Sequence, residues 1–393
     1  MQVFTPLFRN INMHQKRPVT VLLAPLDWGL GHATRCIPII NELIAQGARV
    51  LVAASGTQKT LLEMEFPGLE FFNIPGYEIR YKKGFLLKWA LIFRIPSILR
   101  QIRREHAWLE QCVAEHNIDL VISDNRYGLY HKKTLCVFIT HQLFIQSGTG
   151  FLKNTKSLPE TKRKKDSWAD RRILKWNYRF ISKFSECWIP DQDGIFSLAG
   201  ILSHPPVLPP LPMKYIGILS RFKQVGTPIE KNSLLLLLSG PEPQRTQLED
   251  IICIQLADMS LKTTIVRGLP GMDSPPPAIN GVRIFNHLPA DELNEIIQSS
   301  EFIIARSGYS TIMDLVKMKK NAILIPTPGQ TEQEYLGHYL QENGWMFTAP
   351  QKGFNLRNAL QDFQQQNLKI PEVQGELLQT AIQDVLTRIK NIK

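Results

Sequence analysis

The chain has 393 residues, of which 44% are hydrophobic and 21% are charged, so it holds enough apolar material for the cores of two globular domains. The net charge of +11 is concentrated in two stretches: residues 80–104 contain eight basic residues and no acid, and residues 153–183 contain eleven basic and three acidic residues. Such clusters suggest an anionic membrane surface, a lipid-phosphate substrate or nucleic acid as a partner.

Cysteine usage and hydropathy exclude several classes of protein. The five cysteines are scattered, odd in number and without a C-x-x-C pair, which argues against a disulfide framework and a zinc site. The N-terminus shows no apolar core of a signal peptide. The longest apolar stretch, residues 84–99, contains Lys88 and Arg94 and is too short and too charged to cross a bilayer. We therefore expect a cytoplasmic protein. If it binds a membrane, we expect it to be peripheral on the inner face.

Strand-like and helix-like stretches alternate through the first half of the chain. An apolar run at 19–23 leads into a glycine-containing loop at 25–31, an amphipathic stretch at 33–45 and a second apolar run at 49–54. This order predicts a βαβ unit that opens a parallel sheet. Further strands are predicted, in chain order, at 69–73, 119–123, 135–140, 187–189 and 215–217.

The alternation starts again after a proline-rich passage and a predicted hinge at 226–228. The run of five leucines within 233–238 is typical of a strand buried on both faces. More strands are predicted at 263–266, 282–285, 302–305 and 322–325, and helices at 244–259, 290–298, 311–317 and 332–342. The expected architecture is α/β, with Rossmann-like domains at 1–220 and 221–372 and a C-terminal helix within 373–393 that packs back toward the first domain.

The loop after the first predicted strand reads Asp27-Trp-Gly29-Leu-Gly31-His32. Open parallel sheets bind ligands at the carboxyl ends of their strands, and Gly29 and Gly31 allow a ligand to approach the backbone. A histidine at the start of a helix is disfavoured as a cation, so His32 is a candidate base. The third glycine of the dinucleotide fingerprint is missing. The alternative is a turn whose histidine only caps the helix or packs against it.

A second candidate loop begins at Arg306 and opens the predicted helix at 311–317. Its backbone N–H groups, a glycine and two hydroxyls suit a diphosphate. Asp314, one turn into the helix, is placed to accept hydrogen bonds from both hydroxyls of a ribose. The alternative for Thr311 and Asp314 is a capping box.

Two more loops are expected at the same edge of the second sheet. In one of them, Gln333 and Glu334 could bind the hydroxyls of a sugar, although Thr331 with Glu334 is again a possible capping box. The other contains Ser239 and Gly240, after the leucine-rich strand. Three such loops at one edge are harder to explain by capping than any one of them.

Together these residues resemble glycosyltransferase family 28, which includes the bacterial enzyme that adds N-acetylglucosamine to lipid I and the plant galactolipid synthases. Arg306-Ser-Gly-x-Ser-Thr-x-x-Asp314 and Gln333 are similar to the C-terminal domain of the family, and Gly29-x-Gly31-His32 resembles its acceptor loop. The resemblance implies the GT-B fold: two Rossmann-like domains that face one cleft, with no required metal or other cofactor.

The resemblance also implies roles for individual residues. His32 would be the base, with Asp124, otherwise a cap or turn residue, as a second acid/base candidate. The acceptor side would comprise Gly29, Gly31 and His141. Asp314 would bind the ribose, where the family usually has glutamate. The donor would contact, in chain order, Arg221, Ser239, Gly240, His287, Leu288, Arg306, Ser307, Gly308, Ser310, Thr311, Asp314, Gln333 and Glu334.

The function that the resemblance implies is transfer of a hexosyl or N-acetylhexosaminyl group from a nucleotide-diphosphate sugar, UDP-linked, to an acceptor hydroxyl with inversion. The partners would be this donor and a lipid-linked acceptor of the cell envelope. A nucleotide-sugar hydrolase or epimerase on the same fold is one alternative. A non-catalytic basic module for membranes or RNA is the other, but no nucleic acid is expected, because the positive charge avoids the second half and no RNA-recognition signature is evident.

The basic segment 80–104 allows two interpretations. Phe85, Leu86, Trp89 and Phe93 recur at near-helical spacing among basic residues, as in a helix that rests on anionic lipid. The same pattern fits a helix that packs on the sheet and exposes a solvated basic face. The basic run at 162–165 is more typical of a solvated loop than of a specific site.

Overall fold

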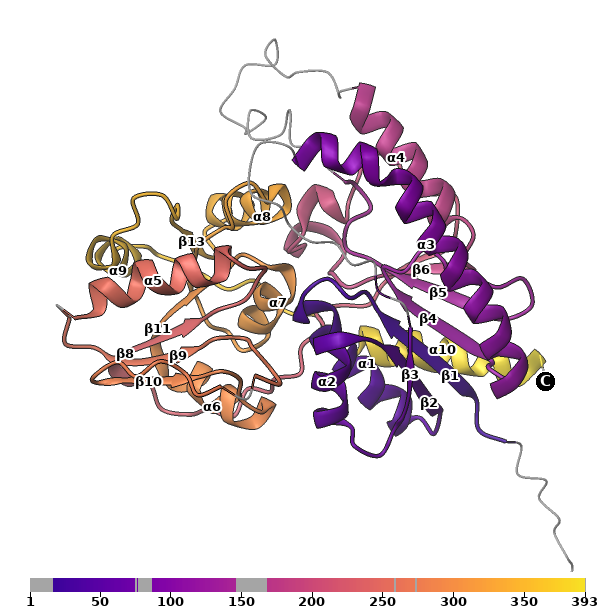
Figure 1. The fold of residues 1–393 in the computed structure, drawn as a ribbon, viewed down its shortest axis with the longest axis horizontal. Coiled ribbons are helices and arrows are strands. Elements are labelled where there is room, and N and C mark those ends of the chain that lie inside the picture. The colour runs from indigo at the N-terminus through magenta and orange to yellow at the C-terminus, as the bar shows by residue number, and fades with distance from the viewer. Residues whose placement is uncertain are drawn as a thin grey trace, which may run out of the picture.

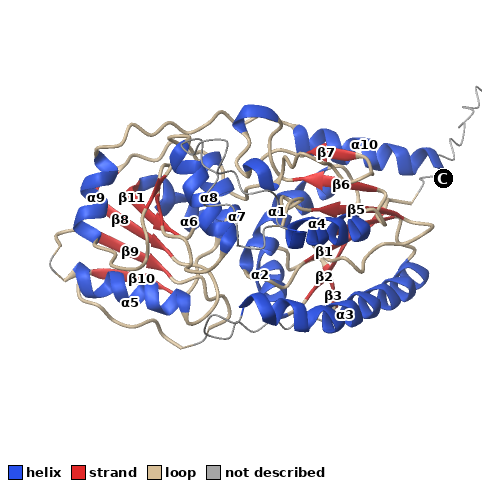
Figure 2. Ribbon diagram, turned by 90° about the horizontal axis from the view of Figure 1, so that it is seen from above, coloured by secondary structure: helices blue, strands red, loops and turns tan. Residues whose placement is uncertain are grey.

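The computed structural model describes residues 17–74, 76, 87–145, 168–257, 259–272 and 274–392, with 87–95 and 168–170 described as backbone only. Figure 1 shows two α/β halves side by side, and Figure 2 shows the strands of each half gathered into one sheet between helices. The expectation of two Rossmann-like halves with parallel sheets is confirmed.

Seven strands form the first sheet, in the order β3-β2-β1-β4-β5-β6-β7, and every pairing is parallel. The strands are β1 (Thr20–Pro25), β2 (Arg49–Ala54), β3 (Glu70–Asn73), β4 (Leu120–Asp124), β5 (Leu135–Ile139), β6 (Glu186–Ile189) and β7 (Met213–Tyr215). All six residues of β1 are buried, because helices cover both faces of the sheet. The strand order reverses between β1 and β4, which is where open sheets of this kind bind ligands.

Helices α1 (Leu30–Ala45), α2 (Gly56–Glu65) and α10 (Leu377–Ile392) cover one face of this sheet, and their apolar side chains share a core with Val21 and Leu23 of β1. Helices α3 (Leu87–His116) and α4 (Trp168–Ile181) cover the other face, where they pack on Leu22 of β1 and Phe138 of β5. Consecutive residues of β1 thus point into different layers, as the alternation of side chains along a strand requires.

The second sheet has six parallel strands in the order β10-β9-β8-β11-β12-β13. They are β8 (Glu230–Leu237), β9 (Lys262–Val266), β10 (Val282–Phe285), β11 (Ser300–Ala305), β12 (Ile323–Leu324) and β13 (Phe347–Thr348). The helices are α5 (Gln244–Leu256), α6 (Ala290–Ser299), α7 (Tyr309–Lys317), α8 (Thr331–Glu342) and α9 (Leu356–Gln364). Here the strand order reverses between β8 and β11, so this sheet has its own ligand-binding position.

The C-terminal helix α10 lies along the first half, although it follows the second half in sequence (Figure 1). Its apolar face, including Ile382, Val385 and Leu386, is buried in the core beside α1. Arg388 forms an ion pair with Glu186 of β6 at 2.6 Å. Helix α10 therefore packs as part of the first domain, although the second domain precedes it in sequence.

Most predicted elements lie within two or three residues of the observed ones, with a few differences. Helix α1 begins at Leu30, so Gly31 and His32 lie in its first turn and not in the preceding loop. Helix α5 ends at Leu256, earlier than predicted. The helices α2, α4 and α9 and the strand β13 were not predicted, and α3 continues to His116, beyond the helical segment considered within 80–104.

Candidate functional site

The loops at the two switch points face each other across the boundary between the domains. Gly31 lies at the start of α1, after β1, and Ser310 lies at the start of α7, after β11. The Ser310 hydroxyl donates a hydrogen bond of 2.8 Å to the backbone carbonyl of Gly31. A Cβ atom on Gly31 would stand only 2.8 Å from the Ser310 Oγ, so this approach needs a glycine. The first-domain and second-domain loops thus contact each other directly across the domain boundary.

His32 and Asp124 meet at the switch point of the first sheet. Asp124 ends β4 and its carboxylate is buried, while the His32 side chain retains 15% of its exposure. Its Nδ1 lies 3.0 Å from the Asp124 Oδ2. Burial, and then the positive charge of Arg35, lower the pKa of His32, so the ring is neutral at pH 7. Asp124 is therefore a partner of the histidine and not merely a turn residue.

Arg35, one turn after His32 on α1, is a part of the site that the sequence reasoning missed. Its buried guanidinium grips Asp124 with two nitrogens, Nε at 2.8 Å from Oδ2 and Nη2 in a close contact with Oδ1. Burial alone would raise the pKa of Asp124, but Arg35 and then His32 outweigh it and hold the pKa at about 2. The i, i+3 spacing from His32 is the signal that could have found it.

His141 extends this network to the second domain. Its Nδ1 lies 3.2 Å from Nη1 of Arg35, and its Nε2 lies 2.8 Å from Oε1 of Glu332, in the first turn of α8. The ring also stacks on Tyr309 of α7, with centroids 4.1 Å apart. Burial would raise the pKa of Glu332, but the hydrogen bond from His141 lowers it. His141, placed on the acceptor side by the sequence, thus sits in an interdomain contact, and Glu332 was not predicted.

Arg306 does not face the space between the domains. Its guanidinium is buried and donates to Gln351 at 2.7 Å, to the carbonyl of Gln244 at 2.6 Å and to that of Ile325 at 3.1 Å. Burial lowers its pKa to about 10. The arginine holds together the loops at the carboxyl ends of the strands, so the prediction of direct donor contact is replaced by a positioning role.

Ser307, Gly308 and Gln333 shape the entry to α7. The Ser307 hydroxyl donates to the carbonyl of Gln333 at 2.8 Å, and the Gln333 side chain accepts from the Thr327 backbone N–H at 2.9 Å. The Gln333 amide nitrogen lies 4.0 Å from the position a Cβ on Gly308 would take. The side chains of Ser307 and Gln333 are both buried, so their hydrogen bonds stabilise the loop from the protein interior.

Both capping-box alternatives are wrong. The N-cap of α7 is Gly308 and that of α8 is Gln330, and neither helix has a side-chain hydrogen bond at its cap. Glu334 instead accepts a hydrogen bond of 2.9 Å from the Gly329 N–H. The first N–H groups of α7, at Tyr309, Ser310 and Thr311, therefore have no capping side chain and can meet an anion.

Asp314 and Arg221 connect α7 to the segment between the domains. Asp314 Oδ1 accepts a hydrogen bond of 2.5 Å from Ser220, and burial raises its pKa to about 7 although Ser220 and Arg221 oppose the shift. Arg221 forms an ion pair of 2.9 Å with Glu65 at the end of α2. Burial and then Arg221 lower the pKa of His287 to about 4. Arg221 thus affects the pKa values of both His287 and Asp314, and all three are predicted donor residues.

The remaining predicted donor residues lie at strand ends. Ser239 and Gly240 follow β8; Gly240 is exposed and has a φ of 104°, and a Cβ added to it would stand 4.0 Å from Oγ1 of Thr327. That hydroxyl is buried without a hydrogen-bond partner, so a polar group is free to contact it there. Leu288, after β10, is 4% exposed and belongs to the core. Gly29, with a φ of 69°, is exposed beside Trp28 on the first-domain side.

Comparison with known proteins agrees with this geometry. Residues 284–389 match the model of the glycosyltransferase family 28 C-terminal domain. An uncharacterized glycosyltransferase of Methanosarcina acetivorans is 25% identical over 340 residues, which cover 81% of this chain and 82% of that protein. The chain is a GT-B glycosyltransferase that resembles family 28.

Solved structures of low sequence identity share the fold of this glycosyltransferase. MurG of Acinetobacter baumannii superposes with a TM-score of 0.50 at 13% identity, over 95% of this chain and 100% of that one. A putative UDP-N-acetylglucosamine 2-epimerase of Listeria monocytogenes superposes with a TM-score of 0.58 at 10% identity, over 96% and 98%. These likenesses concern the fold alone, which is the GT-B fold with two Rossmann-like domains.

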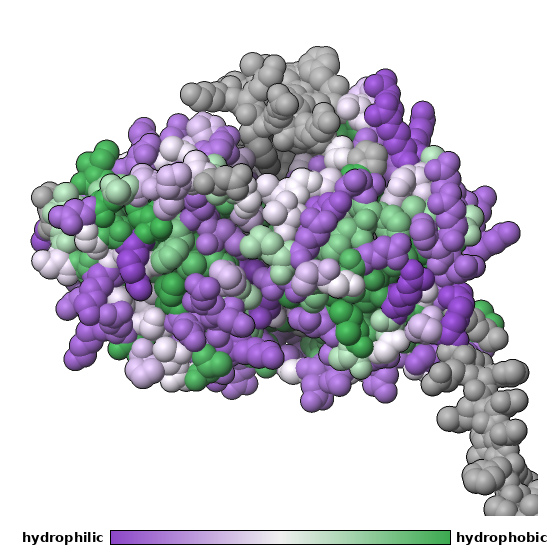
Figure 3. Space-filling model, turned by 60° about the horizontal axis from the view of Figure 1, so that its bottom comes forward, coloured by the Kyte–Doolittle hydropathy of each residue, from purple (hydrophilic) through white to green (hydrophobic). Residues whose placement is uncertain are grey.

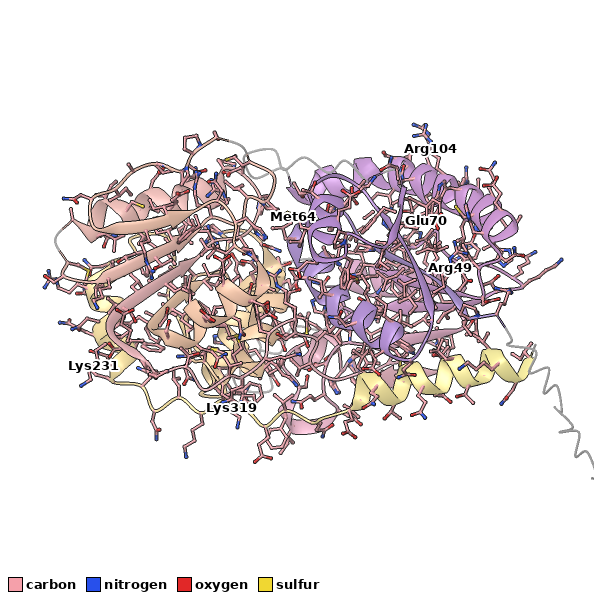
Figure 4. All side chains as sticks on the ribbon, turned by 90° about the horizontal axis from the view of Figure 1, so that it is seen from below. Arg49, Met64, Glu70, Arg104, Lys231 and Lys319 are labelled. Carbon is pink, nitrogen blue, oxygen red and sulfur yellow. The ribbon has the colours of Figure 1, made fainter. Side chains whose placement is uncertain are left out.

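The basic segment of the glycosyltransferase is described only in part. Residues 80–86 and 162–165 lie outside the described residues, as do the side chains of 87–95. Arg100, Arg103 and Arg104 of α3 are exposed, as are the basic residues of α4 from Arg171 onward. Figure 4 shows Arg104 on the outer side of α3, and Figure 3 shows one face of the molecule on which hydrophilic residues are mixed with hydrophobic patches. Within the described ranges, no helix has the length and hydropathy to span a membrane.

The structure offers no ready-made metal centre among the residues it describes: no group of three or more His, Cys, Asp or Glu side chains is arranged to hold an ion. All five cysteines are free. The expectation that transfer requires no metal stays a prediction.

Proposed function

We propose that this glycosyltransferase binds a nucleotide-diphosphate sugar, UDP-linked, between the two switch-point loops and transfers the sugar to an acceptor hydroxyl with inversion. The observation that carries the proposal is the 2.8 Å hydrogen bond between Ser310 and Gly31, because it joins the anion-binding helix start of one domain to the His32 loop of the other. Donor and base then meet in one space.

The donor diphosphate fits the start of α7. The uncapped N–H groups of its first turn and the positive end of the helix dipole stabilise negative charge, which increases on the diphosphate as the sugar leaves. Asp314 lies one turn further on, where its carboxylate is placed to accept from a ribose hydroxyl if Ser220 gives way. No metal is required for this charge stabilisation in the proposed mechanism.

His32 is the proposed base. The acceptor oxygen forms a bond with the anomeric carbon while the bond from that carbon to the diphosphate oxygen breaks, and the acceptor proton moves to the ring nitrogen of His32 that does not face Asp124. Asp124, ionised because of Arg35, stabilises the imidazolium that results. A single displacement of this kind inverts the anomeric centre.

The proposed acceptor is lipid-linked, and the proposed location is the cytoplasmic face of a membrane. Support comes from charge: the exposed arginines of α3 and the exposed basic side chains of α4 lie on the same face of the first sheet. Basic residues near a membrane surface favour anionic lipid. These helices belong to the domain that carries His32, which is the acceptor domain of the proposal.

Product analysis tests the proposal and separates it from its closest competitor. The purified protein is incubated with UDP-, GDP- and dTDP-sugars, with and without extracted lipid acceptors, and the products are identified by mass spectrometry. Transfer to the lipid with release of UDP is expected. Free sugar in the absence of acceptor would indicate a hydrolase, and an isomerised nucleotide sugar would indicate an epimerase, which the fold also serves.

A further inference from the structure

The Nδ1 atom of His32 has two partners that make opposite demands on it. Asp124 Oδ2, at 3.0 Å, is an ionised acceptor and needs a proton on Nδ1. Arg35 Nη2, at 2.8 Å, is a permanent donor and needs the Nδ1 lone pair. A neutral imidazole carries one proton, so Nδ1 can satisfy only one of the two at a time.

The geometry of Arg35 decides between them. The side of its guanidinium formed by Nε and Nη2 grips Asp124, and the end formed by Nη1 and Nη2 reaches the two histidines, His141 and His32. The carboxylate is therefore already satisfied by the arginine, as in other fork-to-fork pairs. The second N–H of Nη2 has His32 as its partner, and it would repel a protonated Nδ1.

The hydrogen bonds of His141 fix its tautomer in the same way, and they connect Arg35 to Glu332 of the second domain. Because Nδ1 of His141 accepts from Arg35, its proton lies on Nε2, from which it donates to Glu332 at 2.8 Å. The contacts from Arg35 to the two histidines and from His141 to Glu332 then each pair a donor with an acceptor. The carboxylate of Glu332, which belongs to the second domain, fixes His141, and His141 in turn fixes Arg35.

We infer that Arg35 is a positioning residue that sets the tautomer of His32, and that Glu332 of the second domain holds Arg35 in place through His141. In the arrangement described, the His32 proton lies on Nε2, so the ring is a donor there and is idle as a base. When Arg35 withdraws from Nδ1, the proton returns to Nδ1, which donates to Asp124, and Nε2 becomes free to accept. This inference rests on the proposed function of His32 as the base.

The other groups that face this cluster do not compete for the same proton. Cys36 of α1 lies 3.8 Å from the Asp124 carboxylate, and burial raises the pKa of its thiol, so it stays protonated. Tyr309 of α7 stacks on His141, and burial raises the pKa of its hydroxyl, which stays protonated and donates to the carbonyl of Pro190 at 2.8 Å. The charged members are Arg35, Asp124 and Glu332.

Nitrogen NMR of the full chain labelled with ¹⁵N-histidine tests the inference without any substrate. The ring signals of His32 and His141 are assigned from His32→Gln and His141→Gln, and both rings are expected as Nε2–H tautomers at pH 7.5. In Arg35→Met the His32 ring should invert to Nδ1–H, with a population change of about tenfold or more, as loss of one charge-assisted hydrogen bond predicts. A ring that is Nδ1–H in the wild type, or unchanged in Arg35→Met, overturns the inference.

A separate variant, with a matched control, tests the claim that Glu332 of the second domain holds Arg35 in place through His141. Glu332→Gln keeps the shape but weakens the bond to His141, so the His32 ring should show a measurable Nδ1–H population. Glu334→Gln, on the same helix but bonded to the Gly329 N–H, should leave both rings unchanged. If Arg35→Met fails to fold, unchanged rings in Glu332→Gln overturn the inference. Turnover of His32→Ala tests the role as base separately, because the tautomers are measured without turnover.

Discussion

The hydroxyl of Ser310 in the second domain donates a hydrogen bond to the backbone carbonyl of Gly31 in the first, at 2.8 Å. This contact joins the two positions at which the strand orders of the sheets reverse. It places the start of α7, suited to an anion, next to the histidine at the start of α1. Substitutions on either side of this contact should therefore affect one shared site.

His32→Ala should lower turnover by about 10²–10⁴-fold, the range expected when a positioned general base is lost, with little change in nucleotide affinity. Asp124→Asn should lower turnover in the same direction, because a neutral amide cannot stabilise the imidazolium. Initial rates and calorimetric titration with UDP measure the two effects. A His32→Ala enzyme with wild-type turnover would remove His32 from the chemistry.

The rate should depend on pH as follows. Burial and Arg35 hold the pKa of His32 below its usual value of about 6.5, so the base is deprotonated at all pH values above that. The kcat of the wild type should thus be flat from pH 8 down to about 6.5 and fall only in more acidic solution. Stopped-time assays across this range check it. A fall of kcat with decreasing pH whose midpoint lies above pH 7 would contradict the assignment of His32 as the base.

Asp314 should make the stability of the protein fall as the pH rises. Its folded-state pKa of about 7 exceeds the unfolded value, so the folded state holds a proton that the unfolded state has lost, and ionisation between about pH 4 and 7 favours unfolding. Asp314→Asn should therefore gain stability relative to the wild type by at least about 1 kcal/mol between pH 5 and pH 8. Denaturant unfolding at both pH values measures this difference, and an equal effect at each would contradict it.

The ion pair between Arg221 and Glu65 should compete with the donor diphosphate for the arginine. Glu65→Gln leaves the buried guanidinium with a weaker partner and should destabilise the protein by about 1–3 kcal/mol. UDP should then raise the melting temperature of Glu65→Gln more than that of the wild type. Glu63→Gln, on the same helix with its i, i+4 pair to Lys59, is the matched control. Equal UDP shifts in both variants would place Arg221 outside the donor site.

The strands could be predicted from the sequence because buried parallel strands are short continuous apolar runs, such as residues 19–23 and 233–238. The loops at their ends could be proposed as binding sites for the same reason, since they follow the strands directly. The contact between Ser310 and Gly31 brings two of these loops together, and their binding role stays a prediction.

The network behind His32 could not be predicted so directly. Arg35, Asp124, His141 and Glu332 come from four different segments, and only the folded chain brings their side chains together. Arg306 was placed in contact with the donor because it begins the motif, but its guanidinium turns into the protein to satisfy the carbonyls of neighbouring loops. The direction of a side chain in a loop depends on such partners.

A reversible cross-link between the two domains tests the central claim most directly. A Cβ on Gly31 would lie 3.3 Å from that of Ser310, close to the spacing of about 3.5–4.5 Å found in disulfides. In the variant Gly31→Cys with Ser310→Cys, mild oxidation should form a disulfide, reduce turnover at least about tenfold because the linked loops cannot part to admit the donor between them, and allow recovery on reduction. The reference is the same variant in its reduced form, because either substitution by itself alters the contact between Gly31 and Ser310. Cysteines that stay unlinked, or a linked enzyme with unaltered turnover, would contradict the account.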